Sequence, residues 1–162
     1  MCSTNYHRAH PASTAKTVVL GVGNLLLSDE GVGVHVVKRL SEMSLPPEVE
    51  VLDGGVAGLG LMNVIMGADR LIVIDAEKGG GDPGSIYRFG PQDLTEHAEG
   101  LTISVHEIGI LEVIRLSDLL GYTPRTTVIG VEPKSMDTGM ELSQEIREKI
   151  PRIIELVLGE LS

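Results

Sequence analysis

The chain is poor in cysteine and in aromatic residues, and each shortage excludes something. Cys2 is the single cysteine among 162 residues, so no intramolecular disulfide can form, and we expect a reducing, cytoplasmic location. Aromatic residues make up 2% of the chain and tryptophan is absent, so the core must consist of Val, Ile, Leu, Met and Ala. No apolar run approaches the ~20 residues that span a bilayer, and residues 1–16 lack the apolar stretch of a secretion signal.

Positive charge is also in short supply. Thirteen Lys and Arg face 23 Asp and Glu, and the net charge of -10 argues against nucleic acid or an anionic membrane as a partner. Hydrophobic residues at 42% and charged residues at 22% are typical of a globular protein, and the length suits one domain. We therefore expect a disordered extension at residues 1–16, a single domain at residues 17–162, and a monomer.

The order of apolar segments and turn residues predicts strands that alternate with helices. Strands are expected at residues 17–22, 49–52, 70–74, 85–89 and 126–131, and helices at about 29–43, 59–66, 104–120 and 141–158. The glycine-rich connection at residues 79–84 is too short for a crossover helix, so the fourth strand should run antiparallel to the third. The expected fold is a three-layer α/β/α sandwich around a five-stranded, mostly parallel mixed sheet.

The turn after the first strand contains an acidic pair. Residues 21–33 read GVGNLLLSDEGVG, and they join the strand to a helix. A phosphate-binding turn needs an electropositive helix start, whereas Asp29 and Glu30 would repel a pyrophosphate. A nucleotide-binding module remains an alternative, because Gly21 and Gly23 follow a strand, but the position of the third glycine is occupied by Leu26.

Five motifs in collinear order resemble those of the hydrogenase maturation endopeptidases. They are residues 21–33, LDGGVAG at 52–58, LIVIDA at 71–76, SVHE at 104–107 and IGVEP at 129–133, and the resemblance covers roughly residues 17 to 158. It implies an endopeptidase that removes the C-terminal extension from the nickel-loaded large-subunit precursor of a hydrogenase. The nickel would be supplied by that precursor, and no tightly bound cofactor of the enzyme itself is expected.

Three candidate ligands should converge at the carboxyl ends of the parallel strands, where open α/β sheets bind ligands. Glu30 follows the first strand, Asp75 ends the third, and His106 begins the third long helix. Two carboxylates and one imidazole suit zinc or nickel and leave coordination positions open. In the resembled family these three positions form the metal-binding site. Asp53, a fourth candidate, either orients His106 or the substrate or caps the glycine loop at 54–58.

Each candidate also has a purely structural interpretation. Glu30 suits a helix N-terminus, His106 suits a capping or surface position, and a carboxylate such as Asp75 at the end of a buried strand needs a partner or a use. Asp29 should point about 100° away from Glu30 around the helix. No Gly-x-Ser-x-Gly elbow supplies a serine nucleophile. A non-catalytic, metal-binding maturation chaperone with the same three ligands therefore remains the second alternative.

Overall fold

A computed structural model describes residues 15–94 and 109–162. Within these residues the strands are β1 (Thr17–Val22), β2 (Val49–Gly55), β3 (Arg70–Ala76), β4 (Ile86–Phe89) and β5 (Arg125–Val131). The α-helices are α1 (Val32–Leu40), α2 (Met62–Met66), α3 (Ile110–Leu119) and α4 (Gln144–Leu161). Three short 3-10 helices accompany them, η1 (Ser28–Gly31), η2 (Gly58–Leu61) and η3 (Pro91–Leu94).

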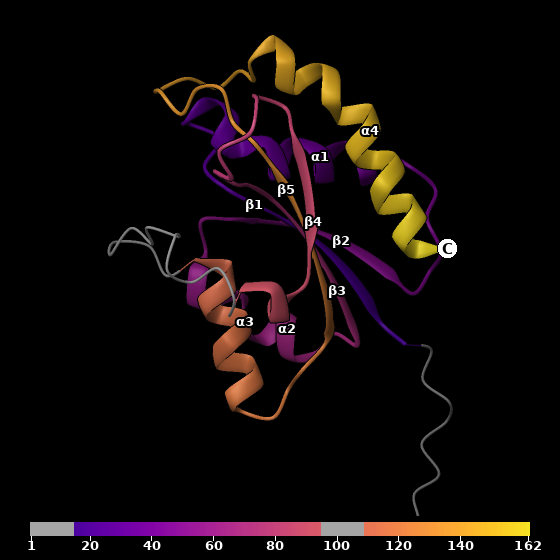
Figure 1. Cartoon of the computed structure of the whole chain (residues 1–162). Coiled ribbons are helices and arrows are strands. Elements are labelled where there is room, and N and C mark those ends of the chain that lie inside the picture. The colour runs from indigo at the N-terminus through magenta and orange to yellow at the C-terminus, as the bar shows by residue number, and fades with distance from the viewer. Residues whose placement is uncertain (1–14, 95–108) are drawn as a thin grey trace, which may run out of the picture.

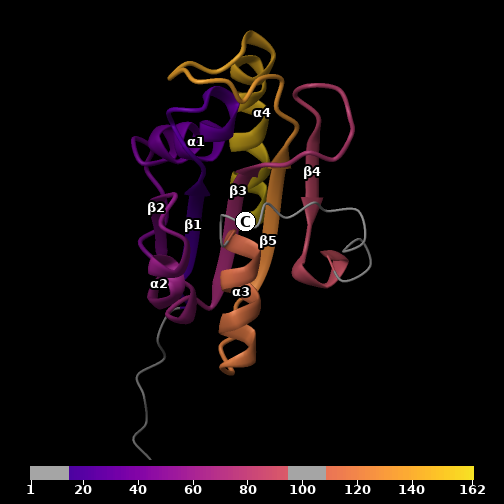
Figure 2. The ribbon, with the colours of Figure 1, turned by 90° about the vertical axis from the view of Figure 1, so that its left-hand side faces the viewer.

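The five strands form one sheet in the order β2-β1-β3-β5-β4. All neighbouring strands are parallel except β4, which is antiparallel to β5. The predicted sheet is thereby confirmed, and so is the direction of the fourth strand, although its partner is β5 and not β3. Strand β5, and not β4, pairs with β3 because of burial. Strand β5 ends in four buried residues, which suit an interior position, whereas β4 is half-buried and suits the edge of the sheet (Figure 2).

Helices cover both faces of the sheet, α1 and α4 on one side and α2 and α3 on the other (Figure 1). The alternation along β3 divides its side chains between the two layers. Ile72 and Ile74 pack with α1 and α4, while Leu71 and Val73 pack with α2 and α3. The buried apolar side chains of the described residues are Val, Leu, Ile and Ala, which agrees with the expectation of a core without aromatic residues.

Several element boundaries differ from the prediction. The first helix is divided into η1 and α1, and the last helix runs from Gln144, through Pro151, to Leu161 and not from about residue 141 to 158. Helix α3 begins at Ile110, because Gly109 is extended (φ -66°, ψ 161°), and not at Ser104. Residues 104–108, where this helix was expected to begin and which include His106, lie outside the described residues.

The first described residues are attached to the sheet. The backbone N–H of Lys16 donates to a carboxylate oxygen of Asp69 at 2.7 Å, and its carbonyl accepts from Asp69 and Arg70. Lys16 thus belongs to the fold, whereas residues 1–14 lie outside the described residues. No helix in the described ranges is both long enough and apolar enough to cross a bilayer.

Candidate functional site

Glu30 and Asp75 line one cavity at the carboxyl ends of the parallel strands. Glu30 lies in η1, the element that follows β1, and Asp75 lies near the end of β3. Both side chains are half-buried, and both border a cavity of about 520 Å³. We call this hollow the acidic cavity. Two of the residues predicted from the sequence are therefore brought together at the predicted edge of the sheet.

Close backbone packing brings Glu30 to this position, and glycines allow it. A Cβ atom on Gly33, in the first turn of α1, would lie 2.1 Å from the carbonyl oxygen of Ile74. A Cβ atom on Gly23 would lie 1.9 Å from the carbonyl oxygen of Glu30. Any larger residue would push η1 and α1 away from β1 and β3. The glycines of the acidic turn thus hold Glu30 beside the strand that ends in Asp75.

Asp29, the neighbour of Glu30, is buried on the other side of η1 and has a structural role. Its side chain is 0% exposed and accepts four hydrogen bonds. The donors are the backbone N–H groups of Lys134 (3.0 Å), Ser135 (2.9 Å) and Ser143 (2.7 Å) and the Ser143 hydroxyl (2.6 Å). We call this arrangement the Asp29 anchor.

The electrostatics of the Asp29 anchor favour a charged carboxylate. Burial by itself raises the pKa of Asp29, but the hydrogen bonds from Ser143, Ser135 and Lys134 outweigh burial and hold the pKa below its ordinary value. The sequence indicated only that Asp29 should point away from Glu30. Its donors lie more than 100 residues further along the chain, so no local pattern could identify them.

Ser28 adds a second attachment between η1 and the same distant segment. Its φ angle is +52°, an unusual value for a residue other than glycine. The Ser28 hydroxyl donates to the carbonyl of Asp137 at 2.7 Å, and its N–H donates to the carbonyl of Gly139 at 2.8 Å. The position of Glu30 therefore depends on residues 134–143, for which the sequence predicted no role.

Asp53 is placed differently from the other candidates. Its side chain is exposed, it is not among the residues that line the acidic cavity, and its Oδ1 accepts a hydrogen bond from the N–H of Gly55 at 2.9 Å. This hydrogen bond agrees with one of the two roles considered for Asp53 from the sequence, that of capping the glycine loop at 54–58. Asp53 thus holds the glycine loop that borders the acidic cavity.

The third predicted ligand, His106, lies outside the described residues. Its convergence with Glu30 and Asp75 therefore stays a prediction. Within residues 15–94 and 109–162, no group of three His, Cys, Asp or Glu side chains is arranged to hold a metal ion. Two carboxylates in one partly enclosed hollow can bind a cation or transfer a proton, and an imidazole would complete the donor set.

Glu77 and Glu132 form a second acidic pair that the sequence analysis missed. A Cβ atom on Gly130 would lie 2.6 Å from the Cγ of Glu77, so Glu77 packs flat against β5. Burial, together with the charge of Glu132, raises the pKa of Glu77 to about 7. Glu132 is buried and accepts hydrogen bonds from the N–H of Gly79 (2.7 Å) and the Tyr87 hydroxyl (3.3 Å). Their position directly after two apolar strands was the available signal.

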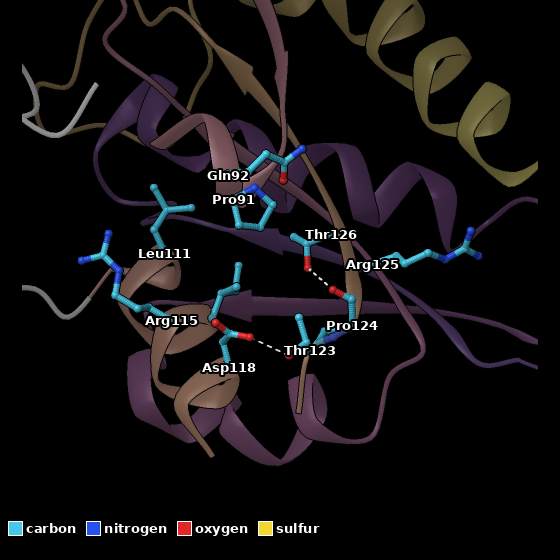
Figure 3. A pocket seen from close by; sticks show the side chains of 10 residues that line it. Pro91, Gln92, Leu111, Arg115, Asp118, Thr123, Pro124, Arg125 and Thr126 are labelled. Carbon is cyan, nitrogen blue, oxygen red and sulfur yellow. Dashed lines mark hydrogen bonds between the residues drawn. The ribbon is translucent and has the colours of Figure 1, made fainter. Parts of the chain in front are cut away.

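A larger cavity, of about 600 Å³, lies at the amino end of β5 and beside α3 (Figure 3). It contains none of the predicted site residues. Two of its polar contacts are internal: the Thr123 hydroxyl donates to Asp118 at 2.6 Å, and the Thr126 hydroxyl donates to the carbonyl of Pro124 at 3.0 Å. We assign the site to the acidic cavity, because that cavity combines carboxylates with the ligand-binding edge of the sheet.

The fold and the acidic cavity define an open α/β protein with an acidic site at the strand ends. Comparison with known proteins identifies the class more closely. A family model described as hydrogenase maturation protease matches residues 34–160. The chain therefore belongs to the hydrogenase maturation protease family, and it is an endopeptidase. This membership favours the enzyme over both alternatives, the chaperone and the nucleotide-binding module.

Individual relatives agree with the family model. The hydrogenase expression/formation protein HupD of Bradyrhizobium diazoefficiens is 38% identical over 150 residues, which are 91% of this chain and 78% of that protein. The hydrogenase 2 maturation protease of Escherichia coli is 33% identical over 151 residues, which are 90% of each chain.

Solved structures support the fold in the same way. The hydrogenase maturating endopeptidase HybD from Escherichia coli has a TM-score of 0.82 and 34% identity, and the match covers 90% of this chain and 91% of that one. A [NiFe] hydrogenase maturation protease HycI from Thermococcus kodakarensis has a TM-score of 0.76 and 26% identity, with 93% and 94% covered.

Proposed function

We propose that this protease removes the C-terminal extension from the nickel-loaded large-subunit precursor of a nickel-containing hydrogenase. The observation that supports the proposal is the acidic cavity, in which Glu30 and Asp75 border one hollow at the carboxyl ends of the strands. Family membership supplies the reaction class, and the relative from Thermococcus kodakarensis carries the name of a [NiFe] hydrogenase maturation protease.

In this proposal the donor set of the enzyme is completed by the substrate. Glu30, Asp75 and His106 provide two carboxylates and one imidazole, which suit a divalent first-row metal and leave coordination positions open. The nickel of the precursor occupies those positions, so recognition and orientation of the cleavage region occur together. Asp53 serves as a positioning residue, because its carboxylate holds the loop at Gly55.

The same arrangement suits a hydrolytic step. A metal held by these residues would polarise the scissile carbonyl or activate a water molecule. A cavity carboxylate would accept the proton of the attacking water and pass it to the leaving amine as the peptide C–N bond breaks. Orientation of the peptide by a shared metal lowers the barrier by several kcal/mol, on the order of what well-oriented intramolecular reactions gain.

Matched nickel-loaded and nickel-free precursors test the proposal. We expect the enzyme to shorten only the loaded precursor, and mass spectrometry of the product should show a loss from the C-terminus. The Glu30→Gln variant serves as the control for contaminating proteases. Equal cleavage of both precursors would overturn the shared-metal mechanism, and a loss from the N-terminus would overturn the assigned reaction.

A further inference from the structure

The acidic cavity has an apolar rim. Val56 is 68% exposed and Leu59 is 49% exposed, and both border the cavity that contains Glu30 and Asp75. Among the large hydrophobic side chains that are exposed in the described residues, these two are the ones that line this cavity. Apolar surface is therefore exposed directly beside the proposed chemistry.

Hydrogen bonds and glycine conformations hold the backbone of the loop that carries Val56 and Leu59. Gly55 (φ +47°) and Gly58 (φ +51°) lie on either side of Val56, in a conformation that other residues seldom adopt. The carbonyl of Gly55 accepts a hydrogen bond from the N–H of Gly23 at 2.9 Å, which ties the loop to the end of β1. Because the N–H of Gly55 also donates to Asp53, both backbone polar groups of Gly55 are hydrogen-bonded.

The exposed rim continues into the buried part of the cavity. Val22, Leu61 and Ile110 also line the cavity, and each is at most 8% exposed. A side chain that enters past Val56 and Leu59 would therefore meet further apolar side chains inside the cavity. The burial of an apolar side chain in this part of the cavity would favour binding, because its apolar surface leaves water.

We propose that Val56 and Leu59 form a subsite for an apolar side chain of the precursor, adjacent to the peptide bond that is cleaved. The inference rests on the proposed function, and it names the side-chain class that the enzyme selects. Val56 and Leu59 border the same cavity as Glu30 and Asp75. A peptide bond placed at these carboxylates would bring its neighbouring residues to the rim, so we assign the subsite to the segment that is cleaved. The same carboxylates disfavour an acidic side chain at this place.

Near-isosteric polar substitutions test the subsite. Val56→Thr and Leu59→Asn keep the volume of each side chain and remove its apolar surface. With nickel-loaded precursor we expect KM to rise about 10-fold for each variant while kcat changes little, since the loss affects binding. Leu119→Asn is the matched control, because Leu119 is 76% exposed on α3 and does not line the acidic cavity. Leu59→Met should restore the wild-type KM.

The substrate provides the reciprocal test. Serine replaces, one at a time, each apolar residue that flanks the cleavage position determined by mass spectrometry. At the residue that occupies the subsite, the replacement should raise KM about 10-fold with the wild-type enzyme and much less with Leu59→Asn.

The outcomes separate this inference from the proposed function. If the wild type cleaves the precursor and both polar variants keep its KM, the subsite is wrong and the proposed function stands. Calorimetric titration of uncleaved, nickel-loaded precursor into wild type and variants measures Kd directly. Equal Kd values overturn the subsite even if no cleavage is observed, whereas absence of cleavage by the wild type overturns the proposed function.

Discussion

Two acidic regions that adjoin in the chain behave in opposite ways. In the Asp29 anchor, a fully buried carboxylate accepts four hydrogen bonds from residues 134–143. In the acidic cavity, Glu30 and Asp75 are half-buried and border a hollow of about 520 Å³. One peptide bond separates Asp29 from Glu30, and the 3-10 conformation of η1 turns successive side chains by about 120°.

The comparison shows that the environment of a carboxylate, and not its residue type, separates a structural carboxylate from one proposed to act in catalysis. Asp29 is held charged by donated hydrogen bonds and ties η1 to a distant segment. That attachment in turn places Glu30 at the cavity. In the proposed mechanism the anchor contributes to function indirectly, through the position of Glu30, and the two regions should respond differently to substitution.

Neutral substitutions in the acidic cavity should give the largest effect, on activity. Asp75→Asn and Glu30→Gln remove a charge but keep the shape, so we expect cleavage to fall by about 10³-fold or more. The free energy of unfolding should change by about 1 kcal/mol or less, because both side chains are half-buried and border the acidic cavity. Single-turnover cleavage and urea unfolding measure the two quantities. His106→Ala should reduce the cleavage rate in the same way. A normal cleavage rate in any of these variants would show that the substituted residue has no part in the mechanism.

Removal of the anchor carboxylate should give the largest effect on stability. Asp29→Ala leaves four donors without their buried acceptor, and we expect a loss of about 3 kcal/mol in the free energy of unfolding. Glu30→Ala is the matched control and should cost about 1 kcal/mol or less. Similar losses in the two variants would contradict the distinction between the regions.

The pH dependence of the Asp29 anchor has a definite sign. Because the pKa in the folded state lies below the ordinary value of 3.8, the anchor contributes its stability above that pH and loses it as the pH falls further. The difference in stability between wild type and Asp29→Asn should therefore shrink in acid. A difference that stays constant down to the acid transition would contradict the lowered pKa.

The fold was predictable from the sequence to a larger extent than the site. Alternating apolar runs and glycine turns predicted the five strands, because each strand is a local pattern. The position of β4 was not predictable, since it depends on whether β5 or β4 occupies the interior place beside β3. The placement of Glu30 and Asp75 at one edge of the sheet was predictable, because Glu30 lies in the turn after one parallel strand and Asp75 near the end of another, which is a local signal. The Asp29 anchor could not be, because it joins residues more than 100 positions apart.

Glu77 is an intermediate case, because its side chain is half-buried and lies beside the second carboxylate of Glu132. Its pKa of about 7 exceeds the ordinary 4.5, so the folded protein binds more protons than the unfolded chain between these pH values. Stability should fall as the pH rises through this window, by about 2 to 3 kcal/mol as an upper bound. Glu77→Gln should abolish that decline, which thermal unfolding from pH 5 to pH 8 can measure. A variant with the same slope as the wild type would show that Glu77 is ionised throughout.

Ser143→Ala should have the smallest effect, and it tests how the anchor is built. Ser143 is the residue before α4, but its hydroxyl makes no capping hydrogen bond and donates instead to Asp29 at 2.6 Å. We expect the substitution to cost about 1 to 2 kcal/mol, as for a hydrogen bond to a charged acceptor. In an Asp29→Asn background the same substitution should cost less, because the charged acceptor is already absent. If the cost is equal in both backgrounds, the hydroxyl stabilises the start of α4 independently, and the anchor depends on backbone donors alone.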